Sequence, residues 1–278
     1  RILGLRAEGR DPAFEKQQAK HRAISNKFAD VASDFLTKHV SQNRTADETA
    51  RILKRDVLPN WGKRGIHEIG KRDVNDLLDA VVARGSHVMA NRLLAVLRKL
   101  FNWSVSRGII TASPCEGLSA PYREKARDRV LSDEELVAII NTAKQMGGAF
   151  GVIIQMLILT AQRRNEVSEM TWDELDLDNN QWEIPSSRTK NEKPHTVHLS
   201  EQAASVISGI SSIGSFVFTS NGKTPFSGFS KSKKRLDELS GVTNWRLHDI
   251  RRTVTSGMAK LGIAPHIADK ILNHQSGT

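Results

Sequence analysis

Apolar residues recur every three or four positions between about residues 25 and 118, which is the spacing of buried helix faces. This pattern predicts four helices. The first carries the stripe Phe28, Val31, Ala32, Phe35 and Leu36. The second covers about 45–57, opens near Thr45 or Asp47, and should be stopped by Pro59. The third carries Val74, Leu77, Leu78, Val81 and Val82, and the fourth, about 87–106, buries Leu93, Leu94, Leu97, Leu100 and Phe101.

The second half of the chain begins with a helix-start signal at Ser132. Ser132 and Glu135 form a capping box, and Leu136, Ile139, Ile140 and Ala143 follow as a core stripe. Residues 150–159 are apolar on nearly all sides, which predicts a central buried helix. Strands are expected at 181–185 and 195–199, around the turn cluster 191–194, with a further short strand at 215–218. Helices are expected at 227–239, 246–259 and 264–273.

These patterns predict a mainly α protein with a small antiparallel sheet, divided into two domains. A helical domain covers 25–118 and a mixed α+β domain covers 131–278. Residues 119–130 contain Pro121 and a dense run of charge, as an interdomain linker does. Residues 1–24 are polar, with a breaker at Asp11-Pro12, and are expected to be the tail of a preceding element plus a linker.

The net charge indicates the general class of partner, because a basic protein favours a polyanion. The chain has 41 basic and 31 acidic residues, a net charge of +10, and nucleic acid is the commonest such partner. There is no apolar run of membrane-spanning length and no signal-peptide pattern. The single cysteine, Cys115, allows no disulfide framework and is expected to be a semi-buried structural residue. Because the chain opens on Arg1, we expect it to be a piece of a longer protein.

Several cationic groups of the second domain could serve a phosphate. Arg163 follows the buried helix, and Glu166 is spaced to hold its guanidinium, although a structural ion pair would look the same. His248 and Arg251 are three residues apart on one predicted helix, so they share a face. Lys190 lies near a hairpin tip, where charge also serves solubility. His274 follows the last apolar helix and could equally be an ordinary surface histidine.

The remaining motifs give weak support for DNA contact and argue against metal and nucleotide sites. The helix at 87–106 carries Arg92, Arg98 and Lys99 opposite its leucines; this face could follow a DNA backbone or simply be solvated. His195 and His198 face opposite sides of a strand, so no metal site is expected there. The sequence lacks HExxH, CxxC and GxxxxGK[ST] motifs, so zincin, zinc-finger and P-loop functions have no support, and neither a metal nor a cofactor is expected.

The order of these residues resembles the tyrosine recombinase (phage integrase) family over nearly the whole chain. TAQRRNEVSEMTWDELDLD is similar to the family's first-arginine box, SSRTKNEKPHTVHLS to its hairpin lysine segment, and WRLHDIRRTVTSGMAKLGI to its HxxR box. APHIADKILNHQSGT is similar to the segment that leads to the nucleophile. Ala161 stands where a glycine is usual. The branch it most resembles comprises integrases of prophages, satellite phages and genomic islands.

The resemblance implies a role for each residue. Arg163 and Arg251 would clamp the scissile phosphate, with Glu166 supporting Arg163. His248 and His274 would donate to non-bridging oxygens or assist proton transfer, and Lys190 would be the general acid. Residues 1–24 would be a remnant of the arm-binding region, 25–118 the core-binding domain, and 131–278 the catalytic domain. The family's tyrosine nucleophile is expected beyond His274, because the only tyrosine, Tyr122, lies far upstream.

The resemblance also implies partners. They are double-stranded DNA at attachment sites, a homotetramer on that DNA, and an accessory DNA-bending or directionality protein, all in a bacterial cytoplasm and without a membrane. The chain itself would bind DNA without cleaving it. Two alternatives stay open: a DNA-binding regulator that kept the fold and lost its tyrosine, and a type IB topoisomerase-like enzyme. A metal-dependent transposase is disfavoured because no carboxylate triad is apparent.

Overall fold

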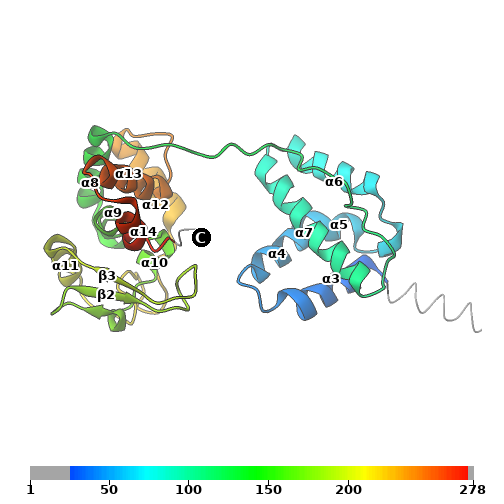
Figure 1. The fold of residues 1–278 in the computed structure, drawn as a ribbon, viewed down its shortest axis with the longest axis horizontal. Helices are drawn as coiled ribbons and strands as arrows, with labels where there is room; N and C mark the ends of the chain where they lie inside the picture. The colour runs from blue at the N-terminus through cyan, green and yellow to red at the C-terminus, as the bar shows by residue number, and fades with distance from the viewer. Residues whose placement is uncertain (1–25, 275–278) are drawn as a thin grey trace, which may run out of the picture. The chain divides into compact units, whose positions relative to one another are not determined.

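The computed structural model describes residues 26–274, which form two compact units divided between Ala126 and Arg127. That division lies inside the segment 119–130 that the sequence marks as a linker. The expectations for residues 1–24 lie outside the described residues. The predicted fold class is confirmed, since helices dominate and the sheet is small and antiparallel (Figure 1).

Unit 1 is helical. Its elements are α3 (Phe28–Phe35), the π-helical turn η1 (Leu36–Val40), α4 (Ala46–Ile52), the π-helical turn η2 (Leu53–Val57), α5 (Leu58–Trp61), the 3₁₀ turn η3 (Ile66–Glu68), α6 (Lys71–Ala83) and α7 (His87–Ser106). All four predicted apolar stripes face the hydrophobic core of unit 1. The long helix α7 has the predicted bounds, and its Leu93, Leu97 and Phe101 are fully buried.

One boundary in unit 1 was predicted wrongly. Pro59 does not stop the second helix, which continues through η2 and α5 to Trp61. A proline lacks the backbone N–H and its ring crowds the preceding turn of an α-helix. Here Pro59 stands in the first turn of α5, where its missing N–H costs no helical hydrogen bond, and the wider π-helical turn η2 comes just before it.

Unit 2 packs helices around a central apolar helix, with the sheet at one end (Figure 1). Its elements are α8 (Asp133–Met146), α9 (Gly148–Thr160), α10 (Arg164–Ser168), the 3₁₀ turn η4 (Trp172–Glu174), β1 (Leu175–Asp176), β2 (Gln181–Ile184), β3 (His195–His198), α11 (Glu201–Ser208), α12 (Phe229–Ser240), α13 (Leu247–Lys260) and α14 (Pro265–Ile271). The capping box at Ser132 is confirmed: its hydroxyl accepts from Glu135 N–H at 3.2 Å.

The sheet differs from the prediction in its third strand. β2 and β3 pair antiparallel, with Trp182 opposite Val197, as expected. The third strand is β1, which the sequence did not reveal, and the predicted strand at 215–218 is wrong. That segment makes an isolated bridge at Phe216, with backbone bonds to Met170 and Trp172. Val217 and Phe218 are apolar because they fill the core, without a strand ladder.

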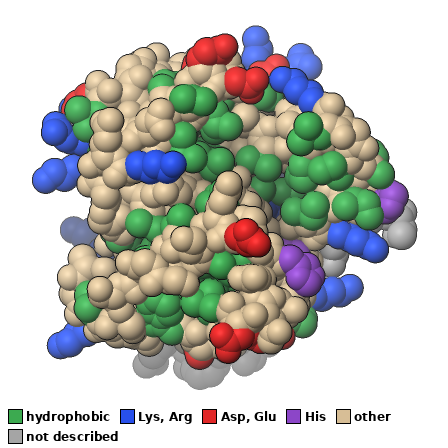
Figure 2. All heavy atoms as spheres, turned by 90° about the vertical axis from the view of Figure 1, so that its left-hand side faces the viewer, with side chains coloured by type: hydrophobic (Ala, Val, Ile, Leu, Met, Phe, Trp, Pro, Cys, Tyr) green, Lys and Arg blue, Asp and Glu red, His purple; other side chains and the backbone are tan. Residues whose placement is uncertain are grey.

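The surface of unit 2 is mixed in character. On the face drawn in Figure 2, Lys and Arg side chains lie mostly around the edge, and hydrophobic side chains occupy patches between them. Within residues 26–274, no helix has the combination of length and apolar character that crossing a bilayer requires.

Candidate phosphate site

The first arginine is placed by a left-handed turn after α9. Ala161 ends α9 with φ of 53°, a conformation that costs a residue with a Cβ about 1 kcal/mol or more. Ala161 is nevertheless almost fully buried, so the surrounding packing holds it there. The turn reverses the chain so that Arg163 caps α10. Alanine in place of the family's usual glycine therefore keeps the turn and adds backbone strain.

Glu166 holds Arg163 at two points. One carboxylate oxygen accepts from the Arg163 backbone N–H at 2.8 Å, and the other accepts from guanidinium Nη1 at 2.8 Å. Glu166 is 3 % exposed, so this carboxylate is committed to Arg163 rather than to solvent. The predicted contact between the two residues is present, and it fixes both the start of α10 and the direction of the guanidinium.

Arg251 is the most buried cation of this group. It lies on α13 with 5 % of its surface exposed. Its Nη1 donates to the carbonyl of Ala161 at 2.5 Å and its Nη2 donates to the carbonyl of Leu272. Burial, followed by the neighbouring charge of Arg163, lowers the pKa of Arg251 to about 10. The guanidinium therefore stays protonated at neutral pH but is poorly compensated, which is the electrostatic condition for binding an anion.

The end of α14 brings the two arginines together. The last turn of a helix leaves carbonyls without helical partners. Here Ile271 O accepts from Gln162 Nε2 at 2.9 Å, Leu272 O accepts from Arg251, and Asn273 O accepts from Arg163 Nη2 at 3.4 Å. Asn273 has φ of 49°, which asparagine tolerates better than most residues. Three consecutive carbonyls thus accept hydrogen bonds from the turn between α9 and α10 and from α13.

The charges of Arg163 and Arg251 act on both predicted histidines, His248 and His274. His248 is exposed in the first turn of α13; partial desolvation, and then the charges of Arg252 and Arg251, lower its pKa. Burial and the charge of Arg251 also lower the pKa of His274, against the opposing effect of Asp269. His274 Nδ1 lies 3.4 Å from Asp269 Oδ1. Both imidazoles are therefore neutral at pH 7, and each then carries one N–H donor.

Lys190 belongs to the long loop between β2 and β3. Its side chain is exposed, and within residues 26–274 no hydrogen bond or ion pair holds the ammonium group in place. Its two neighbours are anchored. Thr189, fully buried, donates from Oγ1 to Lys193 O at 2.7 Å, and Asn191 Nδ2 donates to Asn273 Oδ1 at 2.6 Å. The structure thus ties the Lys190 loop, though not the lysine itself, to the end of α14.

Sequence reasoning missed three polar residues at this site: Gln162, His195 and Asn273. His195 was considered only as a metal ligand, yet its Nε2 lies 3.3 Å from Ile271 O, and burial lowers its pKa. A cavity of about 850 Å³ separates the hairpin from α14 and is lined by Asn191, His195, Asn273 and His274 among others. No His, Cys, Asp or Glu cluster among the described residues could hold a metal ion. Asn273 could have been noticed from its position just after a predicted helix, because asparagine often adopts the left-handed conformation there.

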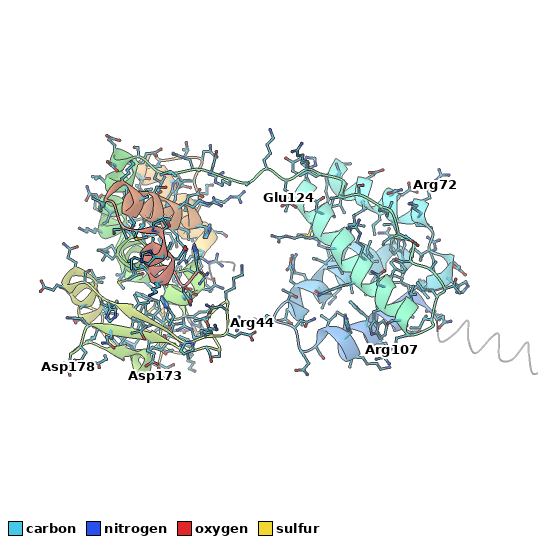
Figure 3. The ribbon with its side chains drawn as sticks, in the orientation of Figure 1. Arg44, Arg72, Arg107, Glu124, Asp173 and Asp178 are labelled. Carbon is cyan, nitrogen blue, oxygen red and sulfur yellow. The ribbon has the colours of Figure 1, made fainter. Side chains whose placement is uncertain are left out.

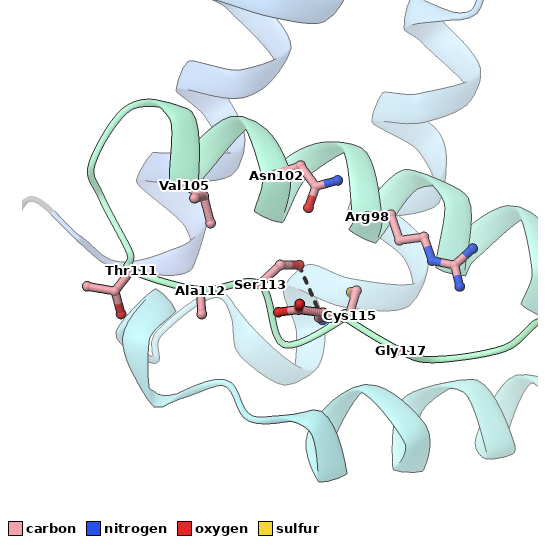
Figure 4. A pocket seen from close by; sticks show the side chains of 9 residues that line it. Arg98, Asn102, Val105, Thr111, Ala112, Ser113, Cys115 and Gly117 are labelled. Atoms are coloured by element: carbon pink, nitrogen blue, oxygen red, sulfur yellow. Dashed lines mark hydrogen bonds between the residues drawn. The ribbon is translucent and has the colours of Figure 1, made fainter.

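The three basic residues predicted to face DNA lie on α7 of unit 1 but differ in exposure and in hydrogen bonding. Arg92 and Lys99 are exposed. Arg98 donates from Nη2 to the carbonyl of Leu118 and lines a cavity of about 680 Å³ together with Asn102 and Cys115 (Figure 4). Arg98 therefore fastens the segment after α7. Cys115 is buried rather than semi-buried, and burial raises the pKa of its thiol to about 11, which disfavours the reactive thiolate.

Tyr122, the only tyrosine in the chain, belongs to unit 1. Its ring stacks on His87 with 5.0 Å between centroids, and its carbonyl accepts from Asn91 Nδ2 at 2.7 Å. The Asn91 amide, which also donates to Glu124 at 2.8 Å, holds the start of the linker segment against α7. Tyr122 is thus a packing residue of unit 1.

Known proteins resemble this chain in both sequence and fold. The prophage integrase IntA of Escherichia coli (strain K12) is 24 % identical over 283 residues, covering 97 % of this chain and 68 % of IntA. The prophage integrase IntZ of the same strain is 28 % identical over 213 residues, covering 73 % of this chain and 52 % of IntZ. The chain thus spans between half and two thirds of these relatives' lengths.

Solved structures agree on the fold. A lambda integrase(75-356) dimer bound to a COC' core site superposes with a TM-score of 0.73 at 16 % identity, over 90 % of this chain and 95 % of that one. A lambda integrase tetramer bound to a Holliday junction gives a TM-score of 0.73 at 17 % identity, over 89 % and 77 %. The Phage integrase central domain matches residues 28–120, and the Phage integrase family matches residues 129–278. The chain belongs to the phage integrase family, whose members are tyrosine recombinases.

Proposed function

We propose that this protein is a site-specific DNA recombinase that cuts and rejoins strands through a 3′-phosphotyrosine intermediate, to integrate or excise a mobile element. One observation carries the proposal. Arg163 and Arg251 donate to the adjacent carbonyls of Asn273 and Leu272, so the two guanidiniums are brought to neighbouring residues at the end of α14. Among the described residues, Glu166 is the one carboxylate that is hydrogen-bonded to either arginine. The surplus positive charge suits a phosphodiester.

Each residue of the site has a proposed role. Arg163 and Arg251 bind the non-bridging oxygens of the scissile phosphate, and Glu166 orients Arg163. His248 and His274 donate hydrogen bonds to the same oxygens or assist proton transfer. Lys190 protonates the leaving 5′-oxygen. His248 and Arg251 fit together because they are one helical turn apart on α13.

The chemistry needs charge stabilisation above all. Attack by a tyrosine oxygen forms a P–O bond, breaks the bond to the 5′-oxygen, and passes through a pentacoordinate phosphorus with extra negative charge. Two guanidiniums and imidazole donors stabilise that charge, and losing one such donor typically costs about a hundredfold in rate or more. The phosphotyrosine bond retains the energy of the broken phosphodiester, so rejoining needs no nucleotide.

The proposed partner is duplex DNA carrying attachment sites. Arg92, Arg98 and Lys99 on α7 would contact its backbone, and the proposed core-binding and catalytic domains, 25–118 and 131–278, would both engage it. The lambda integrase structures contain a dimer on a core site and a tetramer on a Holliday junction. For this protein we propose a homotetramer on DNA, an accessory DNA-bending or directionality protein, and a place with the bacterial nucleoid in the cytoplasm.

A covalent adduct assay tests the function. Tyr122 packs on His87 in unit 1, so we expect the 278 residues to retain DNA without cutting it. A chain extended through the reading frame to a tyrosine beyond Thr278 should form a covalent adduct with a nicked, strand-trapping substrate. Adduct formation by the 278-residue chain would contradict the role of a later tyrosine.

The same assay separates the alternatives. A regulator that had lost its nucleophile would give no adduct even as the extended chain. A type IB topoisomerase-like enzyme would relax supercoiled DNA that has no paired sites, whereas a recombinase would exchange strands between two sites.

A further inference from the structure

The loop that carries Lys190 is fastened on both sides of the lysine. On one side, buried Thr189 donates to Lys193 O at 2.7 Å and to Ser186 O at 3.1 Å, which closes the loop on itself. On the other side, Asn191 reaches out of the loop to Asn273, 82 residues later. The first anchor shapes the loop. Two other contacts set where the loop stands in unit 2. Arg188, two residues before Lys190, pairs with Glu174 and donates from Nη2 to Glu166 O at 2.6 Å, whereas Asn191, directly after Lys190, ties the loop to the end of α14.

The Asn191–Asn273 contact is reciprocal and partly buried. Asn191 Nδ2 donates to Asn273 Oδ1 at 2.6 Å, and Asn273 Nδ2 lies 3.5 Å from Asn191 Oδ1. Asn191 Oδ1 also accepts from Lys193 N–H at 3.4 Å. A side-chain amide has both donors and acceptors, so two asparagines can satisfy each other. Within the described part of the chain, the pair links the Lys190 loop to the residue after α14, beside the contact of His195 Nε2 with Ile271 O at 3.3 Å.

Asn273 is also the residue through which the site is assembled. Its carbonyl accepts from Arg163, the carbonyl before it accepts from Arg251, and the residue after it is His274. One residue thus contacts the arginine cluster by its main chain and the Lys190 loop by its side chain.

From this geometry we propose that Asn191 and Asn273 form a latch that positions Lys190 over the phosphate held by Arg163 and Arg251. The inference rests on the proposed function, in which Lys190 is the general acid. Neither asparagine touches the reacting atoms; each acts through Lys190. A general acid must lie within hydrogen-bond reach of the oxygen it protonates, so a loop that drifts by about 1 Å can cost a hundredfold in rate.

The leaving group provides a test specific to that role. In the normal reaction the tyrosine O–P bond forms, the P–O5′ bond breaks, and the proton of the Lys190 ammonium moves to the 5′-oxygen. When sulfur replaces the bridging 5′-oxygen, the P–S bond breaks instead. A thiol is far more acidic than an alcohol, so the 5′-thiolate leaves without receiving a proton. Sulfur therefore removes the need for Lys190 and for anything that only positions it.

The experiment measures single-turnover cleavage of matched oxygen and sulfur substrates by the chain that carries the proposed nucleophile. The variants are Asn191→Ala, Asn273→Gly and the double variant, with Lys190→Ala as reference. Glycine adopts the left-handed conformation of Asn273 freely, so Asn273→Gly removes the amide and leaves the backbone path intact. Glu192→Asp, in the same loop, keeps its charge and serves as the matched control. Thermal unfolding of each variant reports on folding.

The latch predicts one pattern. Each asparagine variant cuts the oxygen substrate on the order of tenfold to a hundredfold more slowly, the double variant is no worse than the single ones, and the sulfur substrate restores the rate. Glu192→Asp cuts both substrates at the normal rate. A slow Asn191→Ala that sulfur does not restore, while Lys190→Ala is restored, overturns the latch and leaves the function standing. If sulfur fails to restore Lys190→Ala, the general-acid role falls, and the latch falls with it.

Discussion

The guanidinium of Arg251 donates a hydrogen bond to the backbone carbonyl of Leu272, which follows the last turn of α14. Its other bonded acceptor, Ala161 O, is also a neutral carbonyl. The side chain is therefore oriented by the fold without being neutralised by it. An arginine held this way keeps its full charge, and the two carbonyls engage only two of the five N–H donors of its fork.

Replacing Arg251 should separate binding from chemistry. Arg251→Ala should abolish the covalent adduct, because the phosphate loses a donor that matters most in the transition state. DNA retention should stay largely intact, since many other contacts hold the backbone. Gel retention and adduct formation on the same DNA measure both effects. Arg251→Lys, which keeps the charge and loses the fork, should also be strongly impaired. An adduct at the normal rate in Arg251→Ala would refute the assigned role.

Glu166 should matter for both the fold and the site. In Glu166→Gln the amide keeps one acceptor but turns an N–H₂ group towards the donors of Arg163. A buried donor left without an acceptor costs about 1–3 kcal/mol, so the thermal midpoint should fall. Adduct formation should slow on the order of tenfold because Arg163 is no longer fixed. Glu169→Gln, at a half-buried position three residues later, provides the control and should melt and react normally. Equal melting of the two variants would contradict the structural role of Glu166.

Asp249 should make the stability of unit 2 decrease at acidic pH. Burial acts to raise its pKa, but hydrogen bonds from Arg246 N–H and Arg127 outweigh burial and leave the pKa below its usual value. A depressed pKa stabilises the fold above the unfolded value near 3.8, and this stabilisation is lost as the pH falls through the folded pKa. Thermal midpoints below about pH 4 should therefore drop in the natural protein. Asp249→Asn should be less stable at pH 7 and should show a flatter profile in that window.

The histidines should respond to DNA. Desolvation and neighbouring arginines hold the pKa values of His248 and His274 below 6.5 in the free protein. Between those values and 6.5 the unfolded chain binds more protons, so stability should decline as the pH falls through this range. A bound phosphate favours imidazolium and should raise both pKa values. NMR titration of the imidazole C–H signals with and without a DNA duplex measures this. Unchanged pKa values in a saturated complex would place the phosphate elsewhere.

Lys99 should contribute to DNA affinity through charge alone. It is exposed on α7, so Lys99→Ala should weaken binding similarly for all sequences and reduce the slope of log affinity against log salt by about 1. Arg72 projects from α6 with 94 % of its side chain exposed (Figure 3) and is the control; Arg72→Ala should keep the natural slope. Arg98→Ala should also lower the thermal midpoint, because Arg98 is bonded to Leu118 O. A salt slope unaffected by Lys99→Ala would remove α7 from the interface.

Local patterns in the sequence predicted most of the fold because they report on local causes. The leucines of α7 and the capping box at Ser132 each act within a few turns of helix, so their elements appear with the expected starts. The errors arose where tertiary packing decides. Pro59 is accommodated by a preceding π-helical turn, and the apolar segment around Val217 fills the core without pairing as a strand.

The site shows the same division more sharply. Arg163 and Glu166 are three residues apart, so their contact could be predicted from spacing. Gln162 and Asn191 could not, because their partners at Ile271 and Asn273 are 109 and 82 residues away. Family resemblance selected the cations, whereas the backbone carbonyls that hold them carry no sequence signature. Backbone acceptors can be supplied by any residue type, so only the fold reveals them.

The dependence of the site on α14 has a consequence for how the protein is made. Acceptors at residues 271–273 serve donors that lie 109, 110 and 21 residues earlier. A chain synthesised from its N-terminus can fold unit 1 and much of unit 2 while still attached to the ribosome. The arginine pair acquires its final geometry only after α14 has left the exit tunnel. The nascent protein therefore cannot complete the arginine pair's carbonyl contacts before residues 271–273 have emerged.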